Sequence, residues 1–183
     1  SCAAPMTSGN TGNCSNGKIM THPAFISMNV NGFWVGKFET GYRGATSKTG
    51  AEQTNNNYSN IIIKPNVYSW RNNIFYNFFV SQYNYNRSLN SHMMKNTEWG
   101  AVAMLSHSKY ANFITGYSTS AYNTTNGYKA STTGNIYGIY DMSGGSQEYM
   151  AAYRDTTLGS SGFTATTIKN YDVKYFDIYN SLS

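Results

Sequence analysis

The chain has 183 residues with a formal net charge of +5, and only 11% of its residues are charged. Because a typical soluble domain has about 25% charged residues, Asn, Ser, Thr, Gly and the 17 Tyr must supply most of its polar surface. The basic residues form no run of like charge, so we expect no nucleic-acid partner, and no apolar stretch is long enough to span a membrane. The length fits a single domain, whose hydroxyl, amide and phenol groups suit an extracellular surface that binds neutral partners.

The first 20 residues predict an N-terminal arm or loop, because Gly, Ser, Asn and Thr dominate and no apolar period appears. Cys2 and Cys14 lie in this stretch, and in an oxidising compartment we expect them to form a disulfide; the alternative is two unrelated thiols. Residues 1–5 have neither the basic start nor the apolar body of a signal peptide, so the numbering of an exported protein would begin after its signal. One folded domain is expected over residues 21–183.

Short strands are predicted in the first third of this domain. Residues 24–28 and 32–39 predict a hairpin, because the Asn and Gly residues between them tolerate the positive φ of a tight turn. The polar stretch over residues 40–60 predicts a surface loop. Three successive Ile at residues 61–63 predict a short buried strand that ends before Pro65.

Two helices are predicted next. The first covers residues 67–83 with Ser69 as its N-cap, because its apolar residues recur on one helical face. The second begins at Asn96 or Thr97, both good caps, with Glu98 in the first turn, where the helix dipole favours an acid. The residues expected to face the core are Trp70, Ile74, Phe75, Phe78 and Phe79 in the first helix, and Trp99, Val102, Ala103 and Ser106 in the second.

The remainder of the chain predicts long loops and short strands. Residues 110–134 contain few apolar side chains, and a stretch of this length predicts a functional or mobile loop. Residues 148–153 predict a strand, and residues 171–179 predict an edge strand. The predicted strand and helix faces also carry all three tryptophans, which we expect in the core: Trp34, Trp70 and Trp99.

Residues 135–150 organise the chain around a glycine turn. Gly138 and its neighbours allow the backbone to turn sharply and to approach another segment where a side chain would clash. Asp141 and Glu148, two of only eight carboxylates, lie beside this turn. A chain with so few charges does not need both acids for solubility, so the pattern predicts a hydrogen-bonding or metal-binding role.

Four segments are similar in sequence to motifs of a known family. They are GFWVGKFE at residues 32–39, PNVYSW at 65–70, NTEW at 96–99 and GIYDMSGGSQEY at 138–149. In this order they resemble the formylglycine-generating, sulfatase-modifying domain, a branch of the C-type-lectin-like fold. A bacterial surface-protein subgroup of that fold, with many non-enzymatic, pilin-type members, is similar over residues 21–25, 95–110 and 131–145. The resemblance implies an α+β, C-type-lectin-like domain with two helices packed on short twisted antiparallel strands and long loops.

The resemblance also implies a calcium site. Its ligands would be Asp141, the carbonyls of Gly144 and Ser146, and Glu148, and calcium accepts several such oxygens at flexible geometry. The alternative is that Asp141 caps the glycine turn while Glu148 bonds to a backbone amide.

The departures from the family argue against an enzyme. The family's oxidation chemistry uses paired cysteines late in the domain, and this chain has no Cys after Cys14. An iron-dependent branch would need clustered histidines, whereas His22, His92 and His107 are not spaced as ligand pairs, so structural or solvated roles are expected. The family's closing Arg-Gly-Gly strand has no counterpart before Ser183, so we expect the domain to lack its final strand or to receive it from a neighbouring subunit.

Ligand binding is expected in two loops rich in Asn and Tyr, although ordinary solvated loops have the same composition. The chain is therefore predicted to be a non-enzymatic extracellular recognition or structural module, at a bacterial cell surface or virion surface. It would be a subunit of a surface filament or pilus, or an adhesin for glycan or protein ligands; the alternative is a phage or retroelement-diversified receptor-binding protein. The candidate ligand-binding residues are Tyr85, Asn86, Arg87, Tyr117, Tyr122, Asn126 and Tyr128.

Overall fold

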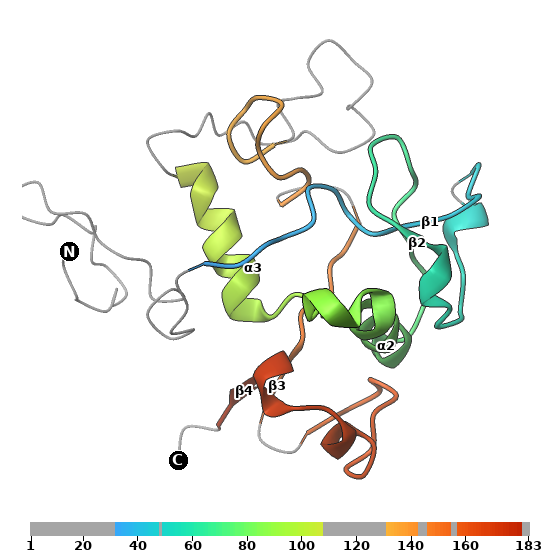
Figure 1. Ribbon diagram of the computed structural model, residues 1–183. Helices are drawn as coiled ribbons and strands as arrows, with labels where there is room; N and C mark the ends of the chain where they lie inside the picture. Colours follow the sequence, from blue (N-terminus) through green and yellow to red (C-terminus); the bar gives the residue numbers. More distant parts are fainter. Residues whose placement is uncertain (1–31, 48, 108–130, 143–145, 155–156, 181–183) are drawn as a thin grey trace, which may run out of the picture.

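The computed structural model describes residues 32–47, 49–107, 131–142, 146–154 and 157–180. These ranges form a mixed α+β domain with two α-helices and two small sheets (Figure 1). The elements are β1 (Gly41–Tyr42), β2 (Ile61–Ile62), α2 (Phe75–Tyr85), α3 (Asn96–Ala103), β3 (Ala152–Arg154) and β4 (Asp177–Tyr179). Short 3-10 helices lie at Thr49–Ala51, Tyr58–Asn60, Arg87–Leu89, Met104–His107, Ile168–Asn170 and Val173–Tyr175. No helix within the described ranges has the length and apolar character needed to cross a bilayer.

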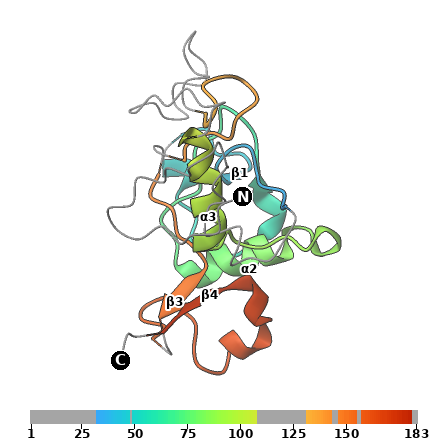
Figure 2. The ribbon, with the colours of Figure 1, turned by 90° about the vertical axis from the view of Figure 1, so that its left-hand side faces the viewer.

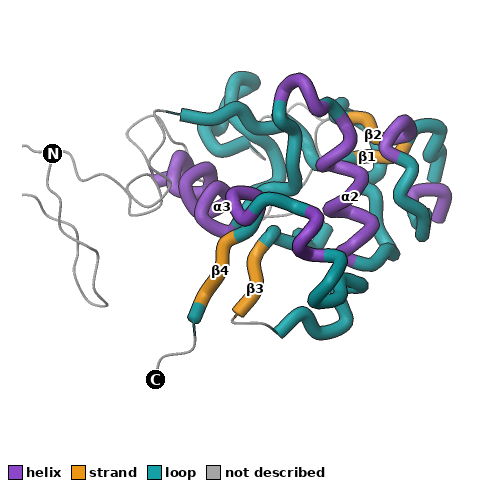
Figure 3. Tube along the Cα trace, turned by 60° about the horizontal axis from the view of Figure 1, so that its bottom comes forward, coloured by secondary structure: helices purple, strands orange, loops and turns teal. Residues whose placement is uncertain are grey.

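Helix α2 is the centre of the hydrophobic core, because one of its faces is aromatic along its whole length. Phe79 on this face is 0% exposed and stacks on Phe176 with 4.6 Å between ring centroids. Phe163 and Tyr171 meet the same ring edge-on, at 5.3 and 5.0 Å. Burying a phenylalanine side chain contributes about 1.5–3 kcal/mol, so these contacts join α2 firmly to the C-terminal segment. Accordingly, α2 lies between the β1–β2 pair and the β3–β4 pair (Figures 1 and 3).

The predicted start of the first helix is wrong, because α2 begins at Phe75 and Ser69 is not its N-cap. The backbone N–H of Trp70 donates to the carbonyl of Thr40 at 2.8 Å, which holds this stretch extended. Asn72 then adopts a left-handed φ of 56°, which ends the extended backbone before the helix. Asn tolerates this left-handed conformation better than most residues, so the helix starts only after it.

The second helix was predicted almost correctly. Helix α3 spans Asn96–Ala103, and the Glu98 carboxylate in its first turn accepts the backbone N–H of Lys95 at 2.9 Å. The N-cap is Lys95 rather than Asn96 or Thr97, and the N–H of Thr97 donates to the carboxylate of Asp177 at 2.6 Å. Asp177 of strand β4 therefore caps the N-terminus of α3, where the helix dipole favours an acid. This cap comes from a segment 80 residues away in the sequence. Figure 2 shows β3 and β4 together at one end of the domain.

The side chains expected in the core of the helical region are mostly covered. Val102 and Ser106 are buried, whereas Trp99 and Ala103 are half-buried. In the first predicted helix Ile74 is an exception, because it is 48% exposed at the boundary of α2. Trp70 is buried as predicted, although it lies in extended backbone before the helix.

The strand predictions are confirmed only in part. β1 pairs antiparallel with β2, which confirms the strand at residues 61–63, but residues 32–39 form no strand, and Trp34 is fully exposed rather than in the core. β3 and β4 are each shorter than predicted and pair in parallel, so the expectation of antiparallel strands holds for one pair only. The predicted strand at residues 24–28 lies outside the described ranges.

The glycine turn is held by hydrogen bonds to both of its sides. The N–H of Thr132 donates to the carbonyl of Ile139 at 2.8 Å, and the N–H of Tyr140 donates to the carbonyl of Lys37 at 2.9 Å. A Cβ at Gly138 would lie 2.8 Å from the backbone nitrogen of Thr133, so this position requires glycine. The turn thereby packs against the segment that carries Lys37, and Ser146, which follows the turn, bonds to Glu39 in that segment.

Candidate binding site

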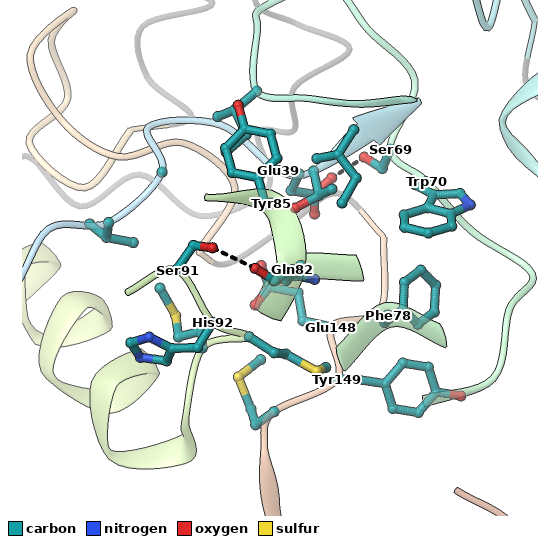
Figure 4. Close-up of a pocket in the computed structure, with 18 of the residues that line it drawn as sticks. Glu39, Ser69, Trp70, Phe78, Gln82, Tyr85, Ser91, His92, Glu148 and Tyr149 are labelled. Carbon is teal, nitrogen blue, oxygen red and sulfur yellow. Dashed lines mark hydrogen bonds between the residues drawn. The ribbon is translucent and has the colours of Figure 1, made fainter. Parts of the chain in front are cut away.

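A cavity of about 1260 Å³ lies beside α2 (Figure 4). Its walls come from residues 33–40, from the segment before α2, from α2 itself, from residues 89–94 with the start of α3, and from residues 146–150. Segments that are far apart in the sequence therefore meet around one space. A cavity of this size, with aromatic walls and a few convergent polar groups, is typical of a small-ligand site.

Aromatic rings form a continuous part of the cavity wall. Trp70 meets Phe78 edge-on with 5.1 Å between centroids, and Phe78 lies 5.9 Å from the ring of Tyr149. Tyr149 is 56% exposed and Tyr85, which also lines the cavity, is 44% exposed. The wall thus combines buried rings, which fix its shape, with tyrosines whose faces and hydroxyls are accessible to a ligand.

Glu39 is a carboxyl group inside this cavity, held by two donors. Its Oε1 accepts the backbone N–H of Ser146 at 3.1 Å, and its Oε2 accepts the hydroxyl of Ser69. Burial raises the pKa of Glu39, and the bonds from Ser69 and Ser146 offset only part of this rise. The donors fix the position of the carboxyl group without supplying a positive charge.

Glu148 is the second carboxyl group of this region, and it accepts the indole N–H of Trp99. Burial raises the pKa of Glu148, the bond from Trp99 lowers it, and the negative charge of Glu39 raises it further. Among the residues that the structure describes, the ion pairs do not involve Glu39 or Glu148. The negative charge of Glu39 therefore acts on Glu148, and no ion pair among the described residues offsets it.

His92 and Glu98 form a different kind of contact on the cavity wall. His92 Nδ1 lies 2.9 Å from the carbonyl oxygen of Asn90, and Nε2 lies 3.1 and 3.2 Å from the two carboxylate oxygens of Glu98. Both partners are acceptors, so the geometry suits an imidazolium that donates from both nitrogens. The bond to Glu98 raises the pKa of His92; burial raises that of Glu98, but the bonds from His92 and Lys95 outweigh it and hold its pKa low.

The predicted calcium ligands lie together only in part. Asp141 is 1% exposed, has a left-handed φ of 67°, and lines a smaller cavity of about 360 Å³ with Ser146 and Glu148. Gly144 lies outside the described ranges. Within those ranges, no three His, Cys, Asp or Glu side chains gather as a metal-binding group, so calcium binding stays a prediction.

The predicted ligand-binding loops have mixed outcomes. Tyr85 and Asn86 line the large cavity. Arg87 instead has a structural position, because its guanidinium lies 3.5 Å from the ring centroid of Tyr83 and donates to the hydroxyl of Tyr175 at 2.9 Å. The remaining predicted site residues lie outside the described ranges: Tyr117, Tyr122, Asn126 and Tyr128, together with the disulfide candidates Cys2 and Cys14.

No motif in the sequence indicates that Glu39 or Ser69 belongs to a site. Glu39 is one of only eight acids and directly follows an aromatic-rich segment, which is the one signal that could have drawn attention to it. Its partner Ser146 is 107 positions away in the sequence, and no local pattern indicates such a contact.

Comparisons with known proteins find no matching family model, no similar curated protein and no similar solved structure. The resemblance to the sulfatase-modifying domain therefore remains a prediction from the sequence.

Proposed function

We propose that this chain is a non-enzymatic extracellular recognition module that binds a glycan in the large cavity. The observation that carries this proposal is the accessible aromatic wall formed with Tyr149 and Tyr85, next to the amides of Gln82 and Asn86. Aromatic rings provide flat apolar contact for a sugar ring, while amides and hydroxyls exchange hydrogen bonds with its hydroxyl groups. Neutral polar groups of this kind are desolvated at lower cost than charges.

The wider setting of the proposal rests on the sequence. The sulfatase-modifying resemblance supports a C-type-lectin-like fold, and its surface-protein subgroup supports a role in a bacterial filament, pilus or adhesin. A low content of charged residues also suits an exposed or assembled surface. In such an assembly, neighbouring subunits would be protein partners of this chain.

A glycan array followed by calorimetric titration tests the binding proposal. Replacing Tyr149 by Ala should weaken binding of an array-positive glycan by about tenfold, since loss of one aromatic contact removes about 1–1.5 kcal/mol. Tyr149→Phe, which keeps the ring, should retain most of the affinity. Tyr58→Ala is the matched control, because Tyr58 is 47% exposed and does not line the cavity. Absence of any glycan binding, or cleavage of the bound glycan, would contradict the proposal.

A diversified receptor-binding protein of a phage or retroelement is the second candidate function. The cavity wall favours it in one respect, because several Asn and Tyr residues gather there, and diversified positions favour these residue types. They include Asn72, Asn73, Asn77, Tyr85 and Asn86. Sequencing the gene and its surroundings decides the matter, since this function requires clustered AAC-type codons and a nearby template repeat.

A further inference from the structure

We propose that the ligand of the large cavity is an amino sugar whose positively charged amine is held by Glu39 and Glu148. This inference rests on the glycan-binding function proposed above and names the class of sugar. The two carboxyl groups line the same cavity as the aromatic wall, and Figure 4 shows both of them among the side chains that surround its space.

The hydrogen bonds of the two carboxylates leave room for a ligand. An ionised carboxylate offers about four acceptor positions. Glu39 uses two of them for Ser69 and Ser146, and Glu148 uses one for the indole of Trp99. These donors hold the oxygens in place, so an ammonium group with three N–H donors can bind without first ordering the carboxylates.

The charges around the cavity favour a cation at this point. Its other charged lining residues are already paired: Arg71 with Glu52 at 2.8 Å, and His92 with Glu98 at 3.1 Å. Glu39 and Glu148 face each other's negative charge instead, which contributes to the raised pKa of Glu148. An ammonium between them would remove this repulsion and add charge-assisted hydrogen bonds, which are stronger than neutral ones.

Two oligosaccharides test the inference, one of glucosamine and one of N-acetylglucosamine. They differ only at the amine, which is free in glucosamine and acetylated, hence uncharged, in N-acetylglucosamine. Calorimetric titration is done at a pH where the free amine is protonated. The glucosamine oligosaccharide should bind at least about tenfold more tightly, as expected for a charge-assisted hydrogen bond. Raising the ionic strength should narrow this preference, because salt screens the charges.

Glu39→Gln and Glu148→Gln test the residues. Each change keeps the shape of the side chain and removes its charge. At position 148 the amide oxygen can still accept the indole N–H of Trp99, and at position 39 it can accept the N–H of Ser146 while the amide NH2 donates to the hydroxyl of Ser69. Each change should reduce the preference for the free amine by about tenfold. Asp172→Asn is the matched control, because it removes the same charge at an exposed position outside the cavity. Circular dichroism of all three variants checks that they fold alike.

The results distinguish the amino-sugar inference from the glycan-binding function on which it rests. Equal affinity for both oligosaccharides, or an unchanged preference in both Gln variants, would overturn the amino-sugar inference while leaving glycan binding intact. Tighter binding of a lysine-containing peptide than of the amino sugar would overturn the sugar part of the inference. If neither oligosaccharide nor any glycan on an array binds, the proposed function fails as well.

Discussion

Helix α2 separates two regions that are both aromatic but are built differently. On one side Phe75, Phe79 and Tyr83 stack at intervals of four residues, with 6.3 Å between successive ring centroids. On the other side Phe78 and Gln82 face the large cavity. The first region is closed by rings from the C-terminal segment, whereas the second keeps space beside polar groups. One helix therefore stabilises the fold with one face and forms a wall of the cavity with the other.

Among the substitutions that distinguish the two faces of α2, a change at Phe79 should destabilise the protein most. Phe79→Ala should lower the free energy of unfolding by about 3–5 kcal/mol, because it leaves a cavity among packed rings. Gln82→Ala, on the cavity side of the same helix, should lower it by less than about 0.5 kcal/mol. Urea denaturation of both variants measures the difference. Similar losses in the two variants would show that the cavity side is also part of the packed core.

A smaller loss is expected at the contact between β4 and α3. Asp177→Ala should lower the free energy of unfolding by about 1 kcal/mol, because the N–H of Thr97 and the start of the helix lose their acceptor. Asp172→Ala is a useful comparison, since Asp172 caps a short 3-10 helix of one turn. Thermal unfolding should rank Asp177→Ala as the more destabilising change, and the reverse order would contradict the capping role.

The His92–Glu98 contact predicts a pH dependence of stability. The pKa of His92 is raised in the folded protein, so its contribution is complete below the unfolded pKa of about 6.5 and is lost as the pH rises through the higher folded value. The pKa of Glu98 is lowered, so its contribution is lost in acid instead. We expect a fall of about 1 kcal/mol on the alkaline side, measured by urea denaturation across this pH range. His92→Gln should remove that fall, and an unchanged pH profile in the variant would exclude this role.

A small gain in stability is expected when the charge of Glu39 in the cavity is removed. The pKa of Glu39 is raised, so its charged form is less favourable in the folded protein than in the unfolded chain. Glu39→Gln should therefore raise the free energy of unfolding at neutral pH by up to about 0.5 kcal/mol, and the gain should disappear in acid, where Glu39 is protonated. A loss of stability at neutral pH would indicate that the bonds from Ser69 and Ser146 require the charge.

The elements that could be predicted are those specified by neighbouring residues. Helix α3 follows from a local cap, since Glu98 bonds to the N–H of Lys95 three positions away. The start of α2 could not be predicted, because the bond from Trp70 to Thr40 depends on a distant segment. Local patterns predicted both helices and short strands, and the family resemblance implied the α+β class, but neither predicted the parallel pairing of β3 with β4.

The candidate site was less predictable than the fold. Tyr85 was predicted to bind a ligand because Tyr and Asn are common in binding loops, and it lines the large cavity. The same composition also pointed to Arg87, whose guanidinium instead packs on Tyr83. Glu148 was singled out as a scarce acid beside a glycine turn. Its relation to Glu39 arises only from the folded chain, which places the two carboxyl groups on one cavity.

The most direct test of the central claim is a nuclear magnetic resonance titration that follows the indole N–H signals of the tryptophans. The indole of Trp99 donates to Glu148, whereas that of Trp70 donates to the carbonyl of Gln53 at 2.8 Å. Addition of a glucosamine oligosaccharide should move the Trp99 signal in a saturable manner. Trp70 also lines the cavity, so its signal reports contact with the aromatic wall. Only the Trp99 shift should fall when an N-acetylglucosamine oligosaccharide replaces the amino sugar. A Trp99 signal that does not move, or equal small shifts of all the signals, would contradict binding of an amino sugar between Glu39 and Glu148.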